Sequence, residues 1–175
     1  YSAGKGTPAV KVWKDGSKSS AKVVTGNAES ISAENWQGKS YSAANKVNIA
    51  DYFEENTQYH YQYTDNYTGD DSVWSAEYDY TTKATDKFSV ILTGDPQVGA
   101  SGSSSDKSAN DASVARDAYN WNKTMQQALK TCPDASFLLS AGDQINQSGA
   151  AKDDDKKTRE SEYAGYLYPS VFRSL

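Results

Sequence analysis

Two short segments of this chain, residues 93–97 (TGDPQ) and residues 141–146 (AGDQIN), each place an aspartate directly after a glycine where an apolar run ends. If the two runs are neighbouring parallel strands, Asp95 and Asp143 emerge at the same edge of one sheet, which is where open α/β sheets bind ligands. Two carboxylates about 4 Å apart repel each other by roughly 4 kcal/mol at an effective dielectric near 20, so the pair calls for a cation. The two segments therefore predict a metal site.

Amides close to the two aspartates extend the candidate ligand set. The side-chain carbonyls of Gln97 and Asn146 can coordinate a hard cation, although each is also an ordinary loop amide when taken alone. A lone aspartate at a strand end is usually a turn or cap residue, whereas two of them at one sheet edge favour metal ligation. The glycine before each aspartate is expected to let a sharply turning loop approach a bound ion. We predict that Asp95, Asp143, Gln97 and Asn146 bind metal, and we assign no catalytic side chain.

The residues between the two segments predict the elements that position them. The apolar runs at residues 88–92 (FSVIL) and 135–139 (ASFLL) indicate strands buried on both faces of a parallel sheet. A Gly/Ser-rich loop at residues 99–110 leads to a helix whose apolar residues recur at spacings of 4, 3, 4 and 3, namely Val114, Ala118, Trp121, Met125 and Ala128. Because strand–helix–strand crossovers are right-handed in almost all proteins, the two strands are expected to be parallel neighbours.

Further signals mark the ends of the helix and the stretch after the second segment. Asn110 or Asp111 is expected to cap the helix, and Pro133 to end it. The charged run at residues 152–157 (KDDDKK) lacks the spacing of a calcium loop and is expected to be a solvated loop. Residues 160–175 are expected to form a helical turn or two followed by a bend.

The first half of the chain predicts a domain of short strands. Apolar and polar residues alternate in five segments, which are residues 10–14, 21–24, 46–49, 58–64 and 74–82. The first two are expected to pair as a hairpin, and residues 58–64 to present a face of tyrosines. Several short strands with polar turns are typical of an antiparallel β-sandwich. The pattern changes after residue 87, so we expect one domain at residues 1–87 and a second at residues 88–175.

Composition restricts the function classes. The 175 residues carry a net charge of −5 with acidic and basic residues intermixed, which leaves no basic face for nucleic acid and argues against such a partner. No apolar run approaches the roughly 18 residues that a membrane-spanning helix needs, and no leader-like segment precedes Tyr1. The abundance of tyrosine, serine, threonine, asparagine and glycine resembles that of secreted bacterial surface proteins, so we expect a secreted or cell-surface protein. The sequence leaves the oligomeric state open.

Two residues with reactive side chains lie outside this pattern. Cys132 is the only cysteine, so it cannot form an internal disulfide, and it has no Cys or His neighbour at metal-ligand spacing. His60 is the only histidine, and it falls on the expected solvent face of a strand in the first domain, where a structural role is favoured over ligation. Neither residue is included in the predicted metal site.

Two stretches resemble a known family. Residues 93–98, the helix containing Trp121, and residues 140–146 (SAGDQIN) resemble the first two motifs of the calcineurin-like metallophosphoesterases, which read D-x-H and G-D-x-x-[DN]. Residues 59–66, followed by residues 74–75 (WS) and 80–82 (YTT), resemble the fibronectin type III-like domain that precedes the catalytic domain in purple acid phosphatases. The fold expected from the resemblance is a fibronectin type III-like β-sandwich followed by the first βαβ portion of an α/β metallophosphoesterase domain.

The resemblance implies a two-metal hydrolase of phosphate monoesters or diesters. Asp95 would bind one metal, Asp143 would bridge both, and Asn146 occupies the last position of the second motif. The metals would be Mn, Fe, Zn or Mg, and they would hold the phosphate while a water attacks in line. Gln97 stands where the family has histidine, and an oxygen ligand there favours Mg or Mn over Zn. The purple acid phosphatases carry tyrosine at the position of Asn146, so their iron–tyrosinate colour is not expected.

The resemblance also leaves part of the metal set unaccounted for. The family's later motifs, which are G-N-H-[DE], a further histidine and G-H-x-H, have no counterpart here, because no histidine follows Asp143. We therefore expect a fragment that contributes half of a metal site, is inactive by itself and lacks the first one or two strands of its sandwich. The histidines would come from downstream in the parent chain or from a second chain. An alternative is a non-catalytic extracellular binding or adhesion module with a degenerate α/β domain, which Gln97 in place of histidine favours.

Overall fold

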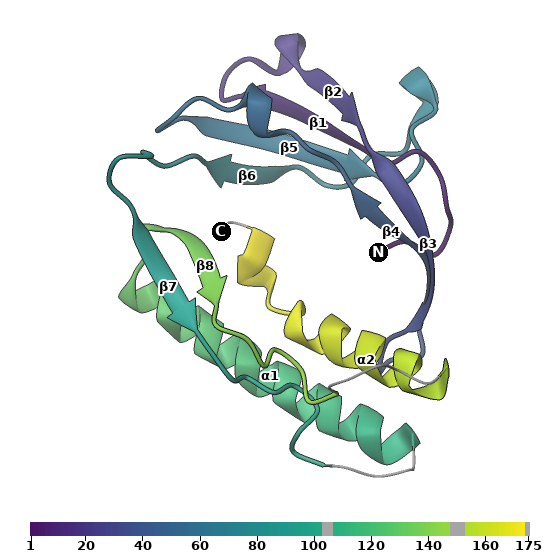
Figure 1. Cartoon of the computed structure of the whole chain (residues 1–175). Coiled ribbons are helices and arrows are strands. Elements are labelled where there is room, and N and C mark those ends of the chain that lie inside the picture. The colour runs from purple at the N-terminus through teal and green to yellow at the C-terminus, as the bar shows by residue number, and fades with distance from the viewer. Residues whose placement is uncertain (103–106, 148–152, 174–175) are drawn as a thin grey trace. The chain divides into compact units, whose positions relative to one another are not determined.

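The computed structural model describes residues 1–102, 107–147 and 153–173. These residues divide into two compact units (Figure 1). The first unit comprises residues 1–32 and 41–88, and the second comprises residues 33–40 together with the described part of 89–173. The segment 33–40 therefore belongs with the second unit, although it lies within the first half of the sequence.

The first unit contains a four-stranded antiparallel sheet of order β2–β1–β5–β6. Its strands are β1 (Ala9–Lys14), β2 (Lys22–Thr25), β5 (Gln58–Thr64) and β6 (Tyr78–Thr81). The alternation in the sequence correctly located the first three of these strands, and β1 and β2 pair as expected. Strand β6 begins later than predicted, because the pairing with β5 starts only at Tyr78.

A second sheet pairs β3 (Asn27–Glu34) with β4 (Ser40–Lys46). Neither strand was predicted, because their sequences (NAESISAE and SYSAANK) alternate small and polar residues that give little apolar contrast. The strand predicted at residues 46–49 is wrong, since β4 ends at Lys46 and the chain leaves the sheet there. With most of its strands in antiparallel sheets, the first half is compatible with a β-sandwich.

Alternate residues of β5 lie on opposite faces of the four-stranded sheet. Tyr59, Tyr61 and Tyr63 share one face as predicted; Tyr59 is buried, whereas Tyr63 is about half exposed. On the other face, His60 lies opposite Trp13 of β1. Single turns of 3-10 helix lie between the strands, at Lys18–Ser20, Ala50–Tyr52 and Gly69–Asp71.

The second unit is built on two adjacent parallel strands, β7 (Ser89–Thr93) and β8 (Ala135–Ser140). Helix α1 (Lys107–Thr131) lies between them in sequence, and helix α2 (Asp153–Tyr166) and a 3-10 turn (Ser170–Arg173) follow. Figure 1 shows β7 and β8 side by side and running in the same direction. Because Thr93 lies opposite Ser140, both strands end at the same edge.

Helix α1 begins earlier than predicted. Its first residue is Lys107, so the expected cap at Asn110 or Asp111 is wrong; residues 107–109 (KSA) contain nothing that interrupts a helix, and the helix extends through them. The helix ends before Pro133, as predicted. The predicted apolar face is buried, since Val114, Ala118, Trp121 and Met125 are each at most 8% exposed. Part of the loop predicted at residues 99–110, residues 103–106, lies outside the described residues.

The loop predicted at residues 152–157 is wrong from Asp153 onward, because helix α2 begins there. Residue 152 lies outside the described residues. The run contains no glycine or proline, and acidic residues are enriched in the first turns of helices, so its composition is compatible with a helix. The helical turn expected near the end of the chain is the last part of this longer helix, and the expected bend follows Tyr166.

The two faces of the β7–β8 sheet differ in exposure. Leu138 packs against the core of the unit, which is formed by Val98, Val114, Trp121, Met125 and Tyr166. Ile91, the partner of Leu138 in register, is buried. On the opposite face, Leu92 and Leu139 lie beside each other and are 68% and 53% exposed. The prediction that both strands are buried on both faces is therefore wrong, because in the described part of the chain this core covers one face of a two-stranded sheet.

Candidate metal centre at the two Gly-Asp turns

The two Gly-Asp turns continue the parallel pairing of β7 and β8 beyond the ends of the strands. The N–H of Asp95 donates to the carbonyl of Gly142 (3.2 Å), and the N–H of Gln97 donates to the carbonyl of Asp143 (2.9 Å). The sequence predicted that the turns lie at one edge, but it did not indicate that they bind each other through their backbones. Asp95 and Gln97 are therefore held beside Asp143 and its loop.

The pairing extends to the fourth predicted ligand. Val98 and Ile145 form a parallel bridge, and the N–H of Asn146 donates to the carbonyl of Val98 (3.1 Å). Asn146 thus lies in the same paired stretch as the two aspartates. The structure brings the backbones of all four predicted ligands together at this edge of the sheet.

Both turns contain backbone in the left-handed region. Asp95 (φ 58°), Gln97 (φ 37°) and Asp143 (φ 49°) adopt it, and among the described non-glycine residues Asn56 is the only other one that does so. Such conformations are uncommon. They cost about 1–3 kcal/mol each and cluster at binding and catalytic sites, where the surrounding structure maintains them. Three of the four predicted ligands therefore have backbone geometry typical of a functional site.

The two glycines of the turns differ in what their positions require. Gly142 has a φ of +112°, which side chains of L-residues rarely adopt, so this position needs glycine. Gly94 lies outside that region, and a Cβ there would meet the Cβ of Ala141 at an ordinary 3.5 Å. The backbone conformation therefore requires glycine at position 142 but not at position 94, and the role of the two glycines in the approach to a bound ion stays a prediction.

The four predicted ligands offer only oxygen donors. Their side chains are exposed, and within the part of the chain that the structure describes no hydrogen bond or ion pair engages the carboxylates of Asp95 and Asp143. Two carboxylates and two amides suit a hard cation such as Mg²⁺ or Mn²⁺. No group of three or more His, Cys, Asp or Glu side chains arranged for a metal occurs among the described residues. The donors fit part of a metal site.

Helix α1 holds the end of the first turn. Asp117 accepts hydrogen bonds from the N–H groups of Gly99 (3.0 Å) and Ser101 (3.1 Å). The hydroxyl of Ser113 donates to the carbonyl of Gly99 (3.0 Å). Sequence reasoning missed Ser113 and Asp117; the available signal was their spacing of four residues, which places both on one side of the helix.

Helix α2 holds the end of the second turn. Glu162 accepts a hydrogen bond at Oε2 from the N–H of Gln147 (2.8 Å), the residue after Asn146. Glu162 is 3% exposed, and this burial raises the pKa of its carboxyl group above the ordinary value. The N–H groups of Gln147 and Asn146 act against the rise in pKa, whereas the charge of Asp117 adds to it. Sequence reasoning missed Glu162 as well.

No protein-family model matches this chain. None of the curated protein sequences matches it either. The assignment of the second unit to the metallophosphoesterases therefore depends on the residues and geometry of the two turns, and it stays a prediction.

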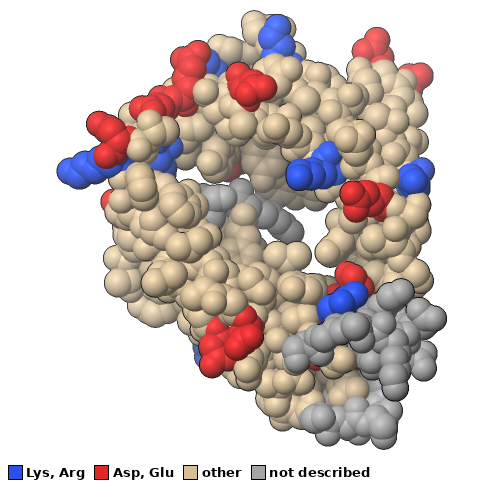
Figure 2. All heavy atoms as spheres, viewed as in Figure 1, with Lys and Arg blue, Asp and Glu red and all other residues tan. Residues whose placement is uncertain are grey.

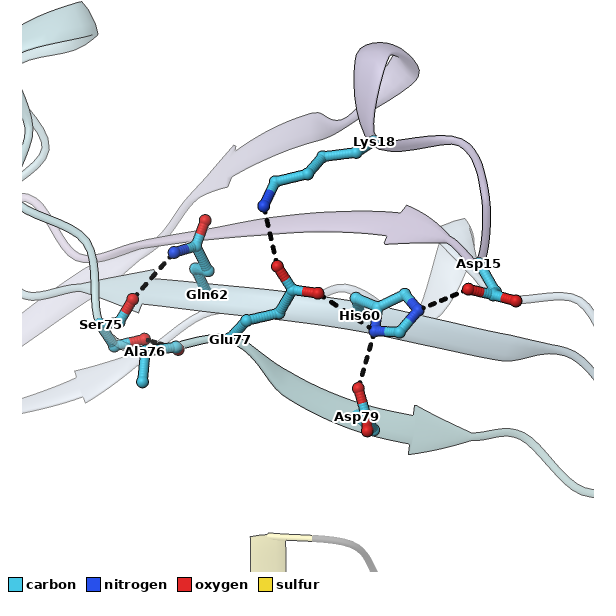
Figure 3. A network of polar contacts seen from close by, with 8 residues as sticks. All are labelled: Asp15, Lys18, His60, Gln62, Ser75, Ala76, Glu77 and Asp79. Atoms are coloured by element: carbon cyan, nitrogen blue, oxygen red, sulfur yellow. Dashed lines mark hydrogen bonds and ion pairs between the residues drawn. The ribbon is translucent and has the colours of Figure 1, made fainter.

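The single histidine lies in the first unit, within a cluster of acidic side chains (Figure 3). His60 Nε2 lies 2.9 Å from Oδ1 of Asp15, and Nδ1 lies 2.7 Å from Oδ1 of Asp79. Glu77 approaches Nδ1 at 3.4 Å, and its other oxygen binds Lys18 at 2.8 Å. The hydrogen bond with Asp15 contributes most to a raised pKa of His60, and Asp79 and Glu77 raise it further. Both ring nitrogens of His60 contact carboxylates, which suits the structural role expected for this residue. Only 15% of its side chain is exposed, so this face of the sheet is more covered than the sequence predicted.

Charged side chains are scattered over the face shown in Figure 2, where lysine and arginine lie among aspartate and glutamate. This matches the intermixed composition of the sequence. Helix α1 is 25 residues long but carries charged residues along its length. Within the described chain, no helix combines the length and apolar character needed to cross a membrane.

Proposed function

We propose that this chain supplies the first part of the metal site of a metallophosphoesterase, an enzyme that hydrolyses phosphate monoesters or diesters with a pair of metal ions. The observation that carries the proposal is the backbone pairing of the two Gly-Asp turns, with Asp95 and Asp143 both in the left-handed region. This pairing brings two acidic turns to the end of a parallel sheet where α/β proteins bind ligands.

Each predicted ligand has a role in this proposal. Asp95 would supply a carboxylate to one metal ion and Asp143 would supply a carboxylate to both, while Gln97 and Asn146 would offer neutral oxygens. Bound metal ions supply positive charge that holds the phosphate oxygens and stabilises the charge developing in the displacement. The carboxylates offset part of the charge of the ions, and the exposed side chains leave the site accessible to a phosphate ester.

The same proposal assigns the first unit to a fibronectin type III-like sandwich of the kind that precedes the catalytic domain in purple acid phosphatases. Its support is the antiparallel sheet and the tyrosine-bearing strand β5. The family's histidine ligands are then supplied from outside this chain, whose one histidine lies in the first unit. The proposal also includes a secreted or cell-surface location, because the composition resembles that of secreted bacterial surface proteins.

Hydrolysis by the parent protein tests the proposal. A protein that carries this chain and the sequence after Leu175 is assayed with p-nitrophenyl phosphate and bis-p-nitrophenyl phosphate in the presence of Mn, Fe, Zn or Mg. We expect metal-dependent hydrolysis that Asp143→Asn abolishes, whereas Asp70→Asn, at an exposed carboxylate of the first unit, leaves it unchanged. An absence of hydrolysis with every metal would contradict the enzyme proposal.

A second candidate function is that of a non-catalytic binding or adhesion module. It is favoured by Gln97 in place of the family's histidine and by an open groove of about 550 Å³ in the first unit. Tyr61, Tyr63 and Trp74 contribute aromatic rings to this groove. The module predicts that the parent protein hydrolyses neither substrate and that its sequence after Leu175 lacks G-N-H-[DE]. Finding that motif favours the enzyme.

A further inference from the structure

We propose that Glu162 is a positioning residue of the candidate metal centre: it holds the end of the second Gly-Asp turn against the first and so fixes how Asn146 is presented. Its effect on a metal rests on the proposed function, whereas the contacts that carry the inference do not. Glu162 lies on α2, outside both turns, and contacts Gly99 and Gln147, which follow the first and the second turn.

Glu162 contacts the second turn through the hydrogen bond that Gln147 N–H donates to Oε2 (2.8 Å). Because Gln147 directly follows Asn146, this bond fixes the peptide on the C-terminal side of the predicted ligand. On the N-terminal side, the N–H of Asn146 donates to the carbonyl of Val98 (3.1 Å). The backbone of Asn146 is therefore held at both ends.

Glu162 contacts the first turn at Gly99. A Cβ at this position would lie 2.7 Å from Cδ and 2.8 Å from Cγ of Glu162, and the φ of Gly99 is +104°. The glutamate side chain thus packs directly against the glycine backbone, and a side chain at position 99 would be strained by its φ and would displace Glu162. Gly99 is itself bound to α1 through Asp117 and Ser113. The Glu162 side chain therefore fills the junction between the ends of the two turns.

Helix α2 is packed tightly enough to serve as a support. A Cβ at Gly165 would lie 2.9 Å from the side chains of Val114 and Val98, so α2 approaches both α1 and the first turn closely at this glycine. At the next residue of α2, the carbonyl of Tyr166 accepts a hydrogen bond from Trp121 Nε1 (2.9 Å). A side chain on a rigid, well-packed element holds site geometry better than one on a loop.

Burying the ionised carboxylate of Glu162 is energetically unfavourable. Glu162 is 3% exposed, and the charge of Asp117 nearby disfavours its ionised form further. Burial of a charge is unfavourable unless it is paired and hydrogen-bonded, and none of the described residues forms an ion pair with Glu162. The interaction that accounts for its orientation is the hydrogen bond to the second turn.

Amide hydrogen exchange of the 175-residue chain, followed by NMR, tests the positioning. In Glu162→Ala we expect exchange at Gln147 to accelerate roughly tenfold, because its N–H loses the acceptor. In Glu162→Gln the amide oxygen still accepts, so we expect exchange within about threefold of the unmodified chain. Asp117→Ala is the matched control on the first turn, and it is expected to accelerate exchange at Gly99 and Ser101 but not at Gln147.

The Mn²⁺ affinity of the same variants, measured by calorimetry, tests the consequence for the metal centre. We expect Glu162→Ala to weaken binding roughly tenfold, as is usual when a residue that orients a ligand is removed. Glu162→Gln is expected to restore the affinity to within about twofold, because it keeps the hydrogen bond. Rescue by the conservative variant separates positioning from a requirement for the charge itself.

Two results would overturn the inference. One is unchanged exchange at Gln147 in Glu162→Ala, and the other is acceleration that is uniform over α1, α2 and both turns, which would show general destabilisation. If Glu162→Ala does not fold, Glu162→Asp, whose shorter side chain withdraws the acceptor, is measured with the same expectation. A failure of the unmodified chain to bind Mn²⁺ contradicts the proposed function, and the exchange at Gln147 still decides whether Glu162 positions the turn.

Discussion

The two units hold their acidic side chains in different ways. In the first unit, three carboxylates surround the ring of His60, and one of them also binds Lys18, so the protein places its own basic groups among them. At the ends of β7 and β8, Asp95 and Asp143 lie in paired turns, and no described side chain neutralises them. In the first cluster other side chains offset the charge of the carboxylates, whereas in the second the backbones of the two aspartates are paired and no described side chain contacts their carboxylates.

This difference indicates what distinguishes a structural cluster from a candidate ion site. Like charges that lie close together repel unless a cation offsets them, and the first unit supplies that cation from its own sequence. The three carboxylates around His60 have ordinary backbone, whereas Asp95 and Asp143 adopt the left-handed region. Backbone strain together with unpaired carboxylates, rather than the number of acidic residues, therefore favours the turns as the place for an ion from solution.

The largest expected effect tests this comparison directly. Asp143→Asn removes one of two charged donors, so we expect the Mn²⁺ affinity of this chain to fall about 100-fold. Asp79→Asn removes a carboxylate from the His60 cluster and is expected to leave the affinity within about twofold. Isothermal titration with MnCl₂ measures both variants. Equal losses in the two would show that the clusters do not differ in ion binding.

Metal preference at the second unit gives the next largest effect. Gln97→His replaces an amide oxygen by an imidazole nitrogen, and histidine tolerates the left-handed backbone found at this position. We expect the affinity for Zn²⁺ to rise roughly tenfold relative to Mg²⁺. Competition titrations measure the ratio, and Gln58→His, at an exposed position of β5, is the control. An equal rise in both variants would exclude Gln97 from the site.

The cluster in the first unit is expected to respond to pH through one observable group. Because the chain has a single histidine, its ring proton signal in NMR reports His60 alone. We expect a pKa above the ordinary value, and we expect Asp15→Asn to lower it more than Asp79→Asn, since the hydrogen bond with Asp15 contributes most. Asp70→Asn is the control and is expected to leave the titration unchanged. Equal effects of all three variants would show that the contacts of His60 do not set its pKa.

The raised pKa of His60 also determines how the stability of the fold changes with pH. The folded chain holds the proton more tightly, so the contribution is fully present below the unfolded pKa of about 6.5 and is lost as pH rises through the folded pKa. Asp15 acts in the opposite sense, because His60 lowers its pKa; its contribution is lost as pH falls through the lowered value. Urea unfolding is expected to show declining stability on the alkaline side that His60→Gln flattens. An equal decline in both proteins would contradict this assignment.

Regular patterns account for the parts of the fold that the sequence predicted. Strand β5 lies at residues 58–64 because its tyrosines alternate strictly, and the buried face of α1 follows the helical period. Strands β3 and β4 were missed because alternation of small and polar residues carries almost no apolar signal. The exposure of Leu92 and Leu139 was missed because an apolar run does not show how many layers cover a strand.

The candidate site likewise contains residues that the sequence identified and residues that only the packing of the structure shows. Asp95 and Asp143 are recognisable because each follows a glycine at a strand end, and their metal binding stays a prediction. Glu160 and Glu162 have the same chemistry two residues apart, and only the packing of α2 shows that Glu162 is buried while Glu160 is partly exposed. The sequence cannot show which of the two glutamates meets Gln147, because that contact depends on how α2 is rotated against α1 and the turns.

The smallest expected effect comes from comparing how Glu162 and His60 make stability depend on pH. Both groups have a raised pKa, so stability is greatest when each is protonated, but the windows differ: the Glu162 contribution is lost as pH rises from about 4.3 through the folded value. Glu162→Gln removes the buried charge and keeps the acceptor, so we expect the unfolding free energy at neutral pH to rise by up to about 1 kcal/mol. Urea unfolding at neutral pH and near pH 4 measures the difference, which is expected to vanish at the acidic end. If the variant is less stable at neutral pH, the hydrogen bond from Gln147 to the charged carboxylate outweighs the cost of burying it. The second unit would then resemble the first, because it would stabilise the ionised form of Glu162 with its own groups.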